Sequence, residues 1–200
     1  METKDRIICK SIELFTQWGI RFVTMNQIAG ETGISKRTLY EVFKDKDDLL
    51  KQCIEQMAEQ NAIEMEKIIN ASDNTIEALY LIGQHGERKK STVNRLFFED
   101  MDKLYPHLKK LFMKRSDKEE TITFKILKKG INEGIFRKEI DLRIVDTFIH
   151  EMMRICHNSE LFANDTNNSE LVENIVIPYF RGISTQKGQD LLEQHFPTGK

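Results

Sequence analysis

The sequence predicts an all-α protein, and three observations support this prediction. Only three prolines and ten glycines occur in 200 residues, which is few for a chain with many tight turns. Charged residues make up 31% of the chain, and Leu, Ile, Lys and Glu, which favour helices or are tolerated in them, are abundant. Apolar residues also recur at three- and four-residue spacing, the period of amphipathic helices. We expect about nine helices.

The first three predicted helices are short and follow one another closely. They are expected at residues 4–18, 25–32 and 36–43. Thr24 precedes the second helix, with Gln27 at the capping-box spacing, and Gly33 ends it. Ser35 is the expected N-cap of the third helix. The segment is therefore predicted to form three helices joined by tight turns.

The rest of the chain is predicted to be helical with short breaks. A long helix begins at a cap at Asp45 or Asp47 and reaches about residue 70. Further helices are expected at about residues 74–85, 91–104, 106–129, 141–158 and 171–183, with a polar loop at 164–169. Three parts follow: a three-helix domain (residues 1–46), a larger helical domain (residues 47–187), and a tail (residues 188–200) that we expect to be partly disordered.

Composition excludes several classes of protein. No apolar stretch approaches the length of a transmembrane helix, and charges throughout the first 30 residues exclude a signal-peptide core. The three cysteines are far apart and form no CxxC motif, which argues against a zinc site or a disulfide framework. We therefore expect a reduced, cytoplasmic protein that is not associated with a membrane.

Residues 25–42 have the spacing of a helix-turn-helix. Ala29 is small enough for the second helix to cross close by, and Gly33 supplies the positive φ of the turn. Three apolar residues would fix the second helix on the core: Ile34, Leu39 and Val42. Its outward face then carries four polar residues that suit a major groove: Lys36, Arg37, Thr38 and Tyr40. A two-helix hairpin of an ordinary bundle, with merely solvated cations, would have the same spacing.

A longer set of residues stands in register with this motif. It consists of Ile7, Ile8, Leu14, Phe15, Gly19, Thr24, Ile28, Ala29, Gly33, Ile34, Ser35, Thr38, Leu39, Tyr40, Phe43, Lys46 and Leu49. The set resembles the TetR/AcrR family of bacterial transcriptional regulators. The resemblance implies a three-helix DNA-binding domain whose third helix is the recognition helix. It also implies a helical C-terminal domain that dimerises and often binds a small-molecule inducer.

The sequence departs from the family pattern in three places. Lys10 stands where the family usually has Ala, and Met25 stands where a second small hydroxyl residue is frequent. The pair Lys36-Arg37 replaces a variable residue followed by Gly. The first two departures are minor, whereas the third predicts an operator preference of its own.

The resemblance and the charges together predict a set of DNA contacts: Thr24, Ser35, Lys36, Arg37, Thr38, Tyr40, Lys44 and Lys46. Thr24 and Tyr40 would bind phosphates, and the base-reading candidates are Lys36, Arg37 and Thr38. Lys46, at the start of the fourth helix, would be a further backbone contact. Lys44 is included on its charge alone.

The larger domain has no motif of its own. Several Met and Phe residues of the middle helices are candidates for lining an apolar inducer pocket, or are simply core: Met57, Phe97, Met101, Phe112, Met113 and Phe124. The helices at about 141–158 and 170–185 are apolar on one side, and the resemblance implies a four-helix dimer interface. Its candidate residues are Phe148, Met152, Ile155, Ile175 and Tyr179. Packing within one chain is the alternative.

No pattern predicts an enzyme, a metal site or a bound cofactor. The chain shows no Ser/His/Asp set and no Gly-rich phosphate loop. His150 and His157 are seven residues apart, whereas zinc favours pairs at i and i+4 on one helix. The acidic cluster of Glu99, Asp100 and Asp102 is expected to be a solvated helix face.

The helix-turn-helix motif and the family resemblance together imply a homodimeric transcriptional repressor that binds a palindromic double-stranded DNA operator. Its two recognition helices would lie about 34 Å apart, and a largely apolar small molecule would release it. The alternatives are a DNA-binding regulator without an inducer and a helical module that kept the fold without binding DNA. The net charge of −2 is compatible with DNA binding, because residues 1–46 carry 8 basic and 6 acidic side chains against 22 and 26 in the remainder.

Overall fold

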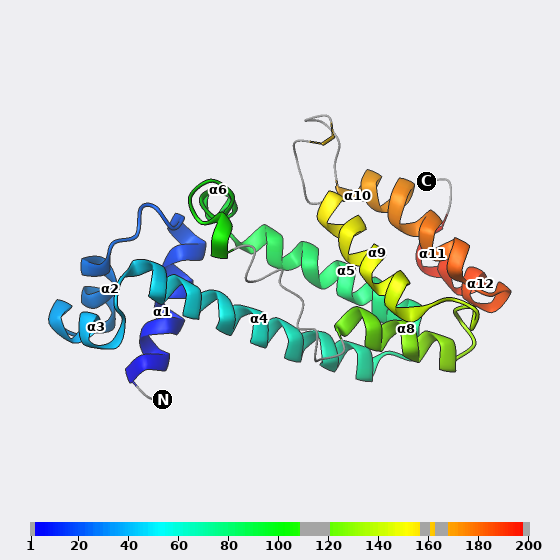
Figure 1. The fold of residues 1–200 in the computed structure, drawn as a ribbon, viewed down its shortest axis with the longest axis horizontal. Coiled ribbons are helices and arrows are strands. Elements are labelled where there is room, and N and C mark those ends of the chain that lie inside the picture. Colours follow the sequence, from blue (N-terminus) through cyan, green and yellow to red (C-terminus); the bar gives the residue numbers. More distant parts are fainter. Residues whose placement is uncertain (1–2, 109–120, 157–160, 163–167, 198–200) are drawn as a thin grey trace. The chain divides into compact units, whose positions relative to one another are not determined.

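The structure, a computed structural model, describes residues 3–108, 121–156, 161–162 and 168–197. Within these ranges the regular elements are helices, and one isolated antiparallel bridge joins Phe136 to Ser184 (Figure 1). The all-α prediction is therefore confirmed. None of the described helices is long and apolar enough to cross a bilayer.

The helices follow one another with short connections. The first six are α1 (Thr3–Trp18), α2 (Met25–Thr32), α3 (Lys36–Val42), α4 (Lys46–Ala71), α5 (Thr75–Thr92) and α6 (Arg95–Leu104). Further along the chain lie α8 (Ile122–Asn132), α9 (Leu142–Cys156), α10 (Asn168–Leu171), the π-helical η1 (Val172–Val176), α11 (Ile177–Ile183) and α12 (Gln186–His195). The first three agree with the predicted ranges to within one residue.

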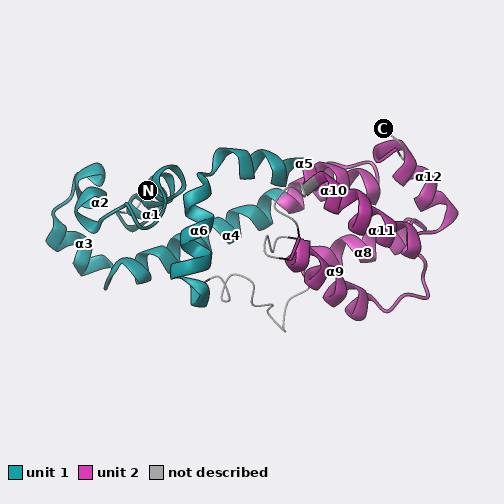
Figure 2. Ribbon diagram, turned by 90° about the horizontal axis from the view of Figure 1, so that it is seen from above, with its two compact units in different colours: residues 1–64, 84–115 teal, residues 65–83, 116–200 magenta. Residues whose placement is uncertain are grey.

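The chain forms two compact units, which Figure 2 shows in different colours. Unit 1 comprises residues 1–64 and 84–115, and unit 2 comprises residues 65–83 and 116–200. The division falls within α4 and α5, whereas the sequence predicted a boundary after residue 46. The reason is that α6 packs on α1 and shares one core with the N-terminal helices.

The core of unit 1 is apolar and continuous. Helices α1 to α4 and the turns between them contribute fully buried side chains: Ile7, Phe15, Ile20, Ile28, Leu39, Phe43 and Leu49. Phe97 and Met101 of α6 belong to the same cluster. The approach of α6 to the end of α1 is close, because a Cβ on Gly19 would lie 2.8 Å from the Cβ of Leu96. Gly19 also has a φ of 84°, so two constraints favour glycine there.

Unit 2 has a separate core, to which α5, α8, α9, α11 and α12 contribute. Its buried residues include Ile76, Leu127, Ile149, Phe180 and Leu192. The last of these belongs to α12, where the sequence predicted a partly disordered tail after residue 187. That expectation is wrong for residues 188–195, because Thr185 caps the helix and Leu192 packs in the core with 1% of its surface exposed.

Three other predicted limits differ from the structure. Helix α5 continues to Thr92, and α6 begins only after the N-cap Asn94. The single helix predicted over residues 106–129 is interrupted, because Thr121 accepts a hydrogen bond from the backbone N–H of Phe124 at 3.0 Å and starts α8. Part of the predicted loop at 164–169 belongs to α10, and residues 164–167 lie outside the described ranges.

Candidate nucleic-acid interface

Helix α2 is fixed at both ends by local signals in the sequence. The Oγ1 of Thr24 accepts a hydrogen bond from the backbone N–H of Gln27 at 3.2 Å. Gly33 follows the helix with a φ of 66°, in the left-handed region that favours glycine. The next N–H, that of Ile34, donates to the carbonyl of Ala29 at 3.0 Å. The chain is thereby turned directly into α3.

Helix α3 is anchored by its apolar side and begins at a strong cap. Leu39 is fully buried, and Phe43, which follows the helix, is fully buried as well. The Oγ of Ser35 accepts from the backbone N–H of Thr38 at 3.0 Å and lies 2.9 Å from its hydroxyl. The hydroxyls of Ser35 and Thr38, both predicted DNA contacts, therefore lie within hydrogen-bond distance of each other at the start of α3. The free backbone N–H groups at a helix start favour phosphate oxygens.

The outward face of α3 carries exposed cations and one aromatic ring. The side chain of Arg37 is 90% exposed, and its Nε donates to Glu41 at 3.1 Å. Lys36 lies with its ammonium 5.9 Å from the centre of the Tyr40 ring, and that ring is 44% exposed. A bond at Nε leaves the two terminal nitrogens of Arg37 available for a bidentate contact with guanine.

The two predicted lysines after α3 have different surroundings. Lys44 is exposed and donates its backbone N–H to Asp48 at 3.0 Å. Lys46 is half-buried, and its ammonium donates to the carbonyl of Ile20 at 2.6 Å. Burial lowers the pKa of Lys46, against the opposing effect of the negative charges of Asp100 and Asp47. The structure thus turns Lys46 towards the protein, where the sequence predicted a contact with the DNA backbone.

Two exposed polar residues of α2 and an aromatic residue before it were missed by the sequence reasoning. Asn26 and Gln27 lie in the first turn of α2, directly after the cap. Phe22 is 59% exposed, and the guanidinium of Arg21 lies 5.0 Å from the centre of its ring. The signal for the first two was their place at a helix N terminus, which favours anions. Nothing in the local pattern indicated that Phe22 is exposed.

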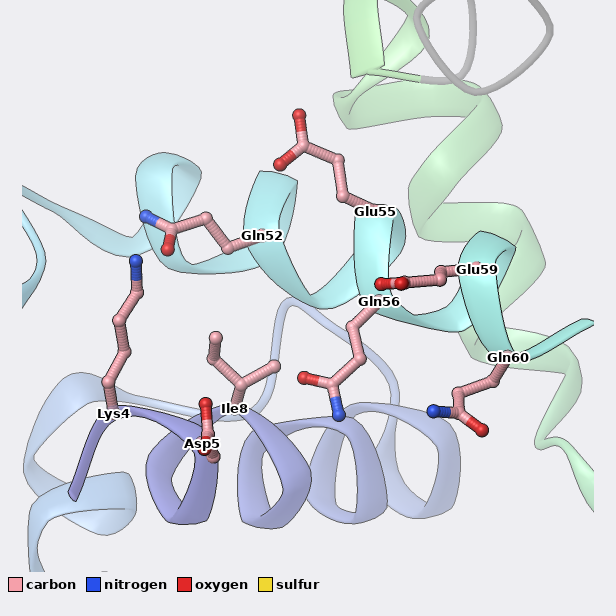
Figure 3. Close-up of a pocket in the computed structure, with 8 residues that line it drawn as sticks. All are labelled: Lys4, Asp5, Ile8, Gln52, Glu55, Gln56, Glu59 and Gln60. Atoms are coloured by element: carbon pink, nitrogen blue, oxygen red, sulfur yellow. The ribbon is translucent and has the colours of Figure 1, made fainter. Parts of the chain in front are cut away.

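The predicted pocket residues are distributed over both units, and two of them lie outside the described ranges. Met57, Phe97 and Met101 belong to the core of unit 1, whereas Phe124 lies in unit 2. Phe112 and Met113 lie outside the described ranges. A hollow between α1 and α4 is lined by other side chains, mostly polar: Lys4, Asp5, Ile8, Gln52, Glu55, Gln56, Glu59 and Gln60 (Figure 3). It therefore does not have the chemistry of the expected apolar pocket.

The predicted dimer residues divide into exposed and buried groups. Phe148 and Ile155 of α9 are 49% and 39% exposed. Met152 is only 4% exposed and belongs to the core of its own unit. Ile175 and Tyr179 are partly buried, and the ring of Tyr179 lies 4.7 Å from that of Phe148. The sequence reasoning omitted Ile144, which is 69% exposed and lies one turn before Phe148.

Titratable groups do not assemble into a metal site within the described part of the chain. His150 lies 3.5 Å from the buried carboxylate of Asp146, which also accepts from the hydroxyl of Thr121 at 2.6 Å. His157 lies outside the described residues. The expectation of a solvated acidic face on α6 is wrong for Asp100, because only 3% of this residue is exposed.

Comparison with known proteins agrees with this geometry. Residues 7–53 match the model of bacterial regulatory proteins of the tetR family. The HTH-type transcriptional regulator YvaF of Bacillus subtilis (strain 168) is 28% identical over 190 residues, covering 92% of this chain and 97% of that protein. Residues 7–53 are therefore a TetR-family DNA-binding domain.

Solved structures of regulators share the fold. A transcriptional regulator from Cytophaga hutchinsonii ATCC 33406 aligns with a TM-score of 0.67 at 21% identity, covering 90% of this chain and 98% of that chain. The structure of RolR in complex with resorcinol aligns with a TM-score of 0.65 at 17% identity, covering 99% of this chain and 95% of that chain. This chain is a transcriptional regulator with a TetR-family helix-turn-helix domain, in which α2 and α3 form the motif.

Proposed function

We propose that this TetR-family regulator is a repressor that binds a palindromic operator as a homodimer. The observation that carries the proposal is the outward face of α3, where Lys36, Arg37 and Tyr40 are exposed while Leu39 is fully buried. A short helix held by its apolar side and presenting cations from its first turn suits the major groove of DNA. Because its target is chromosomal DNA, the protein acts in the cytoplasm.

The contacts divide by chemistry into those that read bases and those that bind the backbone. Lys36 and Arg37 read bases from the N-terminal turn of α3, and Thr38 assists them. Phosphates are bound by Thr24, Ser35, Tyr40 and Lys44. Lys46 is left out of this group, because its ammonium donates to the carbonyl of Ile20. The N–H groups at the start of α2, with Asn26 and Gln27 beside them, extend the phosphate site.

Helix α9 supplies the dimer contact in this proposal. Ile144, Phe148 and Ile155 fall on one face of the helix, because positions four, seven and eleven residues apart share a face. All three are substantially exposed in the single chain. A two-fold dimer would cover the same apolar face on both chains and would present two recognition helices to the two halves of a palindrome.

A small, largely apolar molecule is proposed as the inducer. The family resemblance suggests such a ligand, and the similar structure of RolR is a complex with resorcinol. The residues nominated for the pocket lie in two units or outside the described ranges, so the inducer proposal rests on family membership. A regulator that binds DNA without an inducer, and a helical module without DNA binding, are the alternatives; no enzymatic activity is proposed.

Binding to DNA from upstream of the protein's own gene tests the proposal. Fluorescence anisotropy should show binding to this fragment at least about a thousandfold tighter than to random DNA of equal length. Affinity should fall steeply as salt rises, because phosphate contacts release counterions. Equal affinity for both fragments across the salt range would contradict the proposed sequence-specific repressor. A thermal-shift screen with small phenols and other apolar ligands tests the inducer separately.

A further inference from the structure

Asp100 is a buried carboxylate on a helix whose other acidic residues face solvent. Only 3% of Asp100 is exposed, whereas Asp102 is exposed and Glu99 pairs with Arg95 on the surface at 2.8 Å. Burying a charge costs free energy unless it is paired and hydrogen-bonded. The DNA contacts proposed above leave this residue without a role.

The carboxylate of Asp100 holds the turn between α1 and α2. Its Oδ2 accepts from the backbone N–H of Arg21 at 2.7 Å, and its Oδ1 lies 3.9 Å from the Nε of the same residue. Asp100 lies close to this turn, since a Cβ on Gly19 would lie 3.3 Å from its Oδ2. Hydrogen bonds to charged acceptors are among the strong ones in proteins. Asp100 therefore fixes the backbone at Arg21.

The N terminus of α6 makes a second attachment to the end of α1. The backbone N–H of Asn94 donates to the carbonyl of Thr16 at 2.8 Å, and its side-chain amide donates to the carbonyl of Gln17 at 3.0 Å. These carbonyls belong to the last turn of α1, where the helix itself offers no N–H group to bond them. The two attachments bind α6 to the last turn of α1 and to the turn that follows it.

Lys46 holds the same turn from α4. Its ammonium donates to the carbonyl of Ile20 at 2.6 Å, one residue before the N–H that Asp100 accepts. The N–H of Val23 also donates to Ile20, at 3.3 Å, and Val23 is fully buried. The turn is thus fixed on both sides, directly before the N-cap Thr24.

We propose that Asp100 is a positioning residue for operator binding. Together with Lys46 it fixes residues 19–23, and through them the N-terminal turn of α2, in the geometry that presents Thr24 and the free N–H groups to a phosphate. Asp100 lies outside residues 7–53, the segment that matches the family's DNA-binding domain. The inference rests on the proposed function, since it concerns the affinity of the same DNA interface.

Four variants of the full-length protein test the proposal. Asp100→Ala removes the acceptor for the Arg21 N–H, and Asp100→Asn retains an oxygen acceptor without the charge. Lys46→Met removes the bond to Ile20 and keeps an apolar stem. Asp102→Ala is the matched control, because it removes an exposed carboxylate from the same helix.

Operator affinity is measured by fluorescence anisotropy on folded protein, at several salt concentrations. Asp100→Ala should weaken operator binding about tenfold or more, the loss expected for a charge-assisted hydrogen bond. Asp100→Asn should lose less than Asp100→Ala, and Asp102→Ala should bind like the wild type. Hydrogen exchange at the Arg21 amide should accelerate in Asp100→Ala, whereas a defect elsewhere would leave it unchanged.

The salt dependence separates positioning by Lys46 from direct phosphate contact. As a positioning residue, Lys46→Met weakens binding without changing the slope of log affinity against log salt. As a phosphate contact, it lowers that slope by about 0.9 for each copy of the residue. The second result would overturn the assignment of Lys46.

Failure of this inference differs from failure of the proposed function. If the wild type does not prefer its operator, the proposed function fails. If the wild type binds specifically and folded Asp100→Ala binds equally well, the positioning role is wrong. Should Asp100→Ala not fold, Asp100→Asn and Lys46→Met decide the question, and unchanged operator affinity in both overturns the proposal.

Discussion

Helices α3 and α9 are both held by one buried face, but they present opposite chemistry to solvent. Helix α3 buries Leu39 and exposes Lys36 and Arg37. Helix α9 buries Ile149 and exposes Phe148. Burial follows the same physical rule in both helices, so the outward residues distinguish them. A cationic outward face suits the phosphates and base edges of DNA, whereas an apolar outward face suits another apolar surface.

The largest expected effect concerns the outward face of α9. Phe148→Glu would place a carboxylate in the proposed dimer interface twice, once from each chain. Because a buried unpaired charge costs several kcal/mol, we expect the dimer dissociation constant to rise at least about a hundredfold. Sedimentation equilibrium measures this directly. Operator affinity should fall with it, since a single chain can engage only one half-site.

A charge change elsewhere on α9 is the control for Phe148→Glu. Arg143 is exposed and lies one residue before Ile144, hence about 100° around the helix from the apolar face. Arg143→Glu should therefore affect dimerisation much less. A Phe148→Glu protein that remains folded and dimeric would contradict the proposal that the apolar face of α9 forms the dimer interface.

The next effect concerns the outward face of α3, which we propose reads the bases. Arg37→Ala should cost about 1–3 kcal/mol on operator DNA and less on DNA substituted at the base pair that Arg37 reads. Competition binding against single-substitution operators measures this difference. Equal loss on operator and random DNA would show that Arg37 binds the backbone only.

Unit 1 offers a matched control for Arg37. The side chain of Arg95 on α6 is also 90% exposed and also pairs with a glutamate four residues later, Glu99, at 2.8 Å. Arg95→Ala removes the same charge from the protein without touching α3. We expect its operator affinity to stay close to that of the wild type.

The smallest effect concerns the turn that orients α3. Gly33→Ala should lower the free energy of unfolding by about 1 kcal/mol, because a side chain at a φ of 66° is strained although no atom lies within 4 Å of the added Cβ. Gly30→Ala, inside α2 and equally free of contacts, should raise it by about 0.5–1 kcal/mol. Urea unfolding of both variants gives the comparison. A stabilised Gly33→Ala protein would contradict the strained turn.

Local features of the fold could be predicted from the sequence where short-range chemistry decides them. Thr24 and Ser35 cap helices as predicted, because a side-chain oxygen and an N–H three residues later suffice. Gly33 ends α2 because few other residues adopt its φ without cost. The limits of α2 and α3, which position the candidate DNA interface, follow from such signals.

Features that depend on distant segments could not be predicted. Asp100 and Asp102 look alike in the sequence, yet one is buried against Arg21, 79 residues away. Lys46 was expected to face DNA, but its ammonium is held by Ile20. Met152 lies one turn after Phe148 and is equally apolar, yet Met152 is 4% exposed and Phe148 is 49% exposed. In each case segments that are remote along the chain decide the burial or the contact. Helical periodicity alone does not show which positions of a helix such segments cover.

The π-helical turn η1 has a consequence for the evolution of the chain. The N–H of Ile177 donates to the carbonyl of Val172, five residues earlier, so the segment holds one residue more than a regular α-helical turn would. A single-codon deletion here would leave a sequence that can close as a regular α-helix, with its flanking residues still in phase. Relatives that differ by one residue at this point can therefore keep the same core, and a gap in their alignment here need not signal a change of fold.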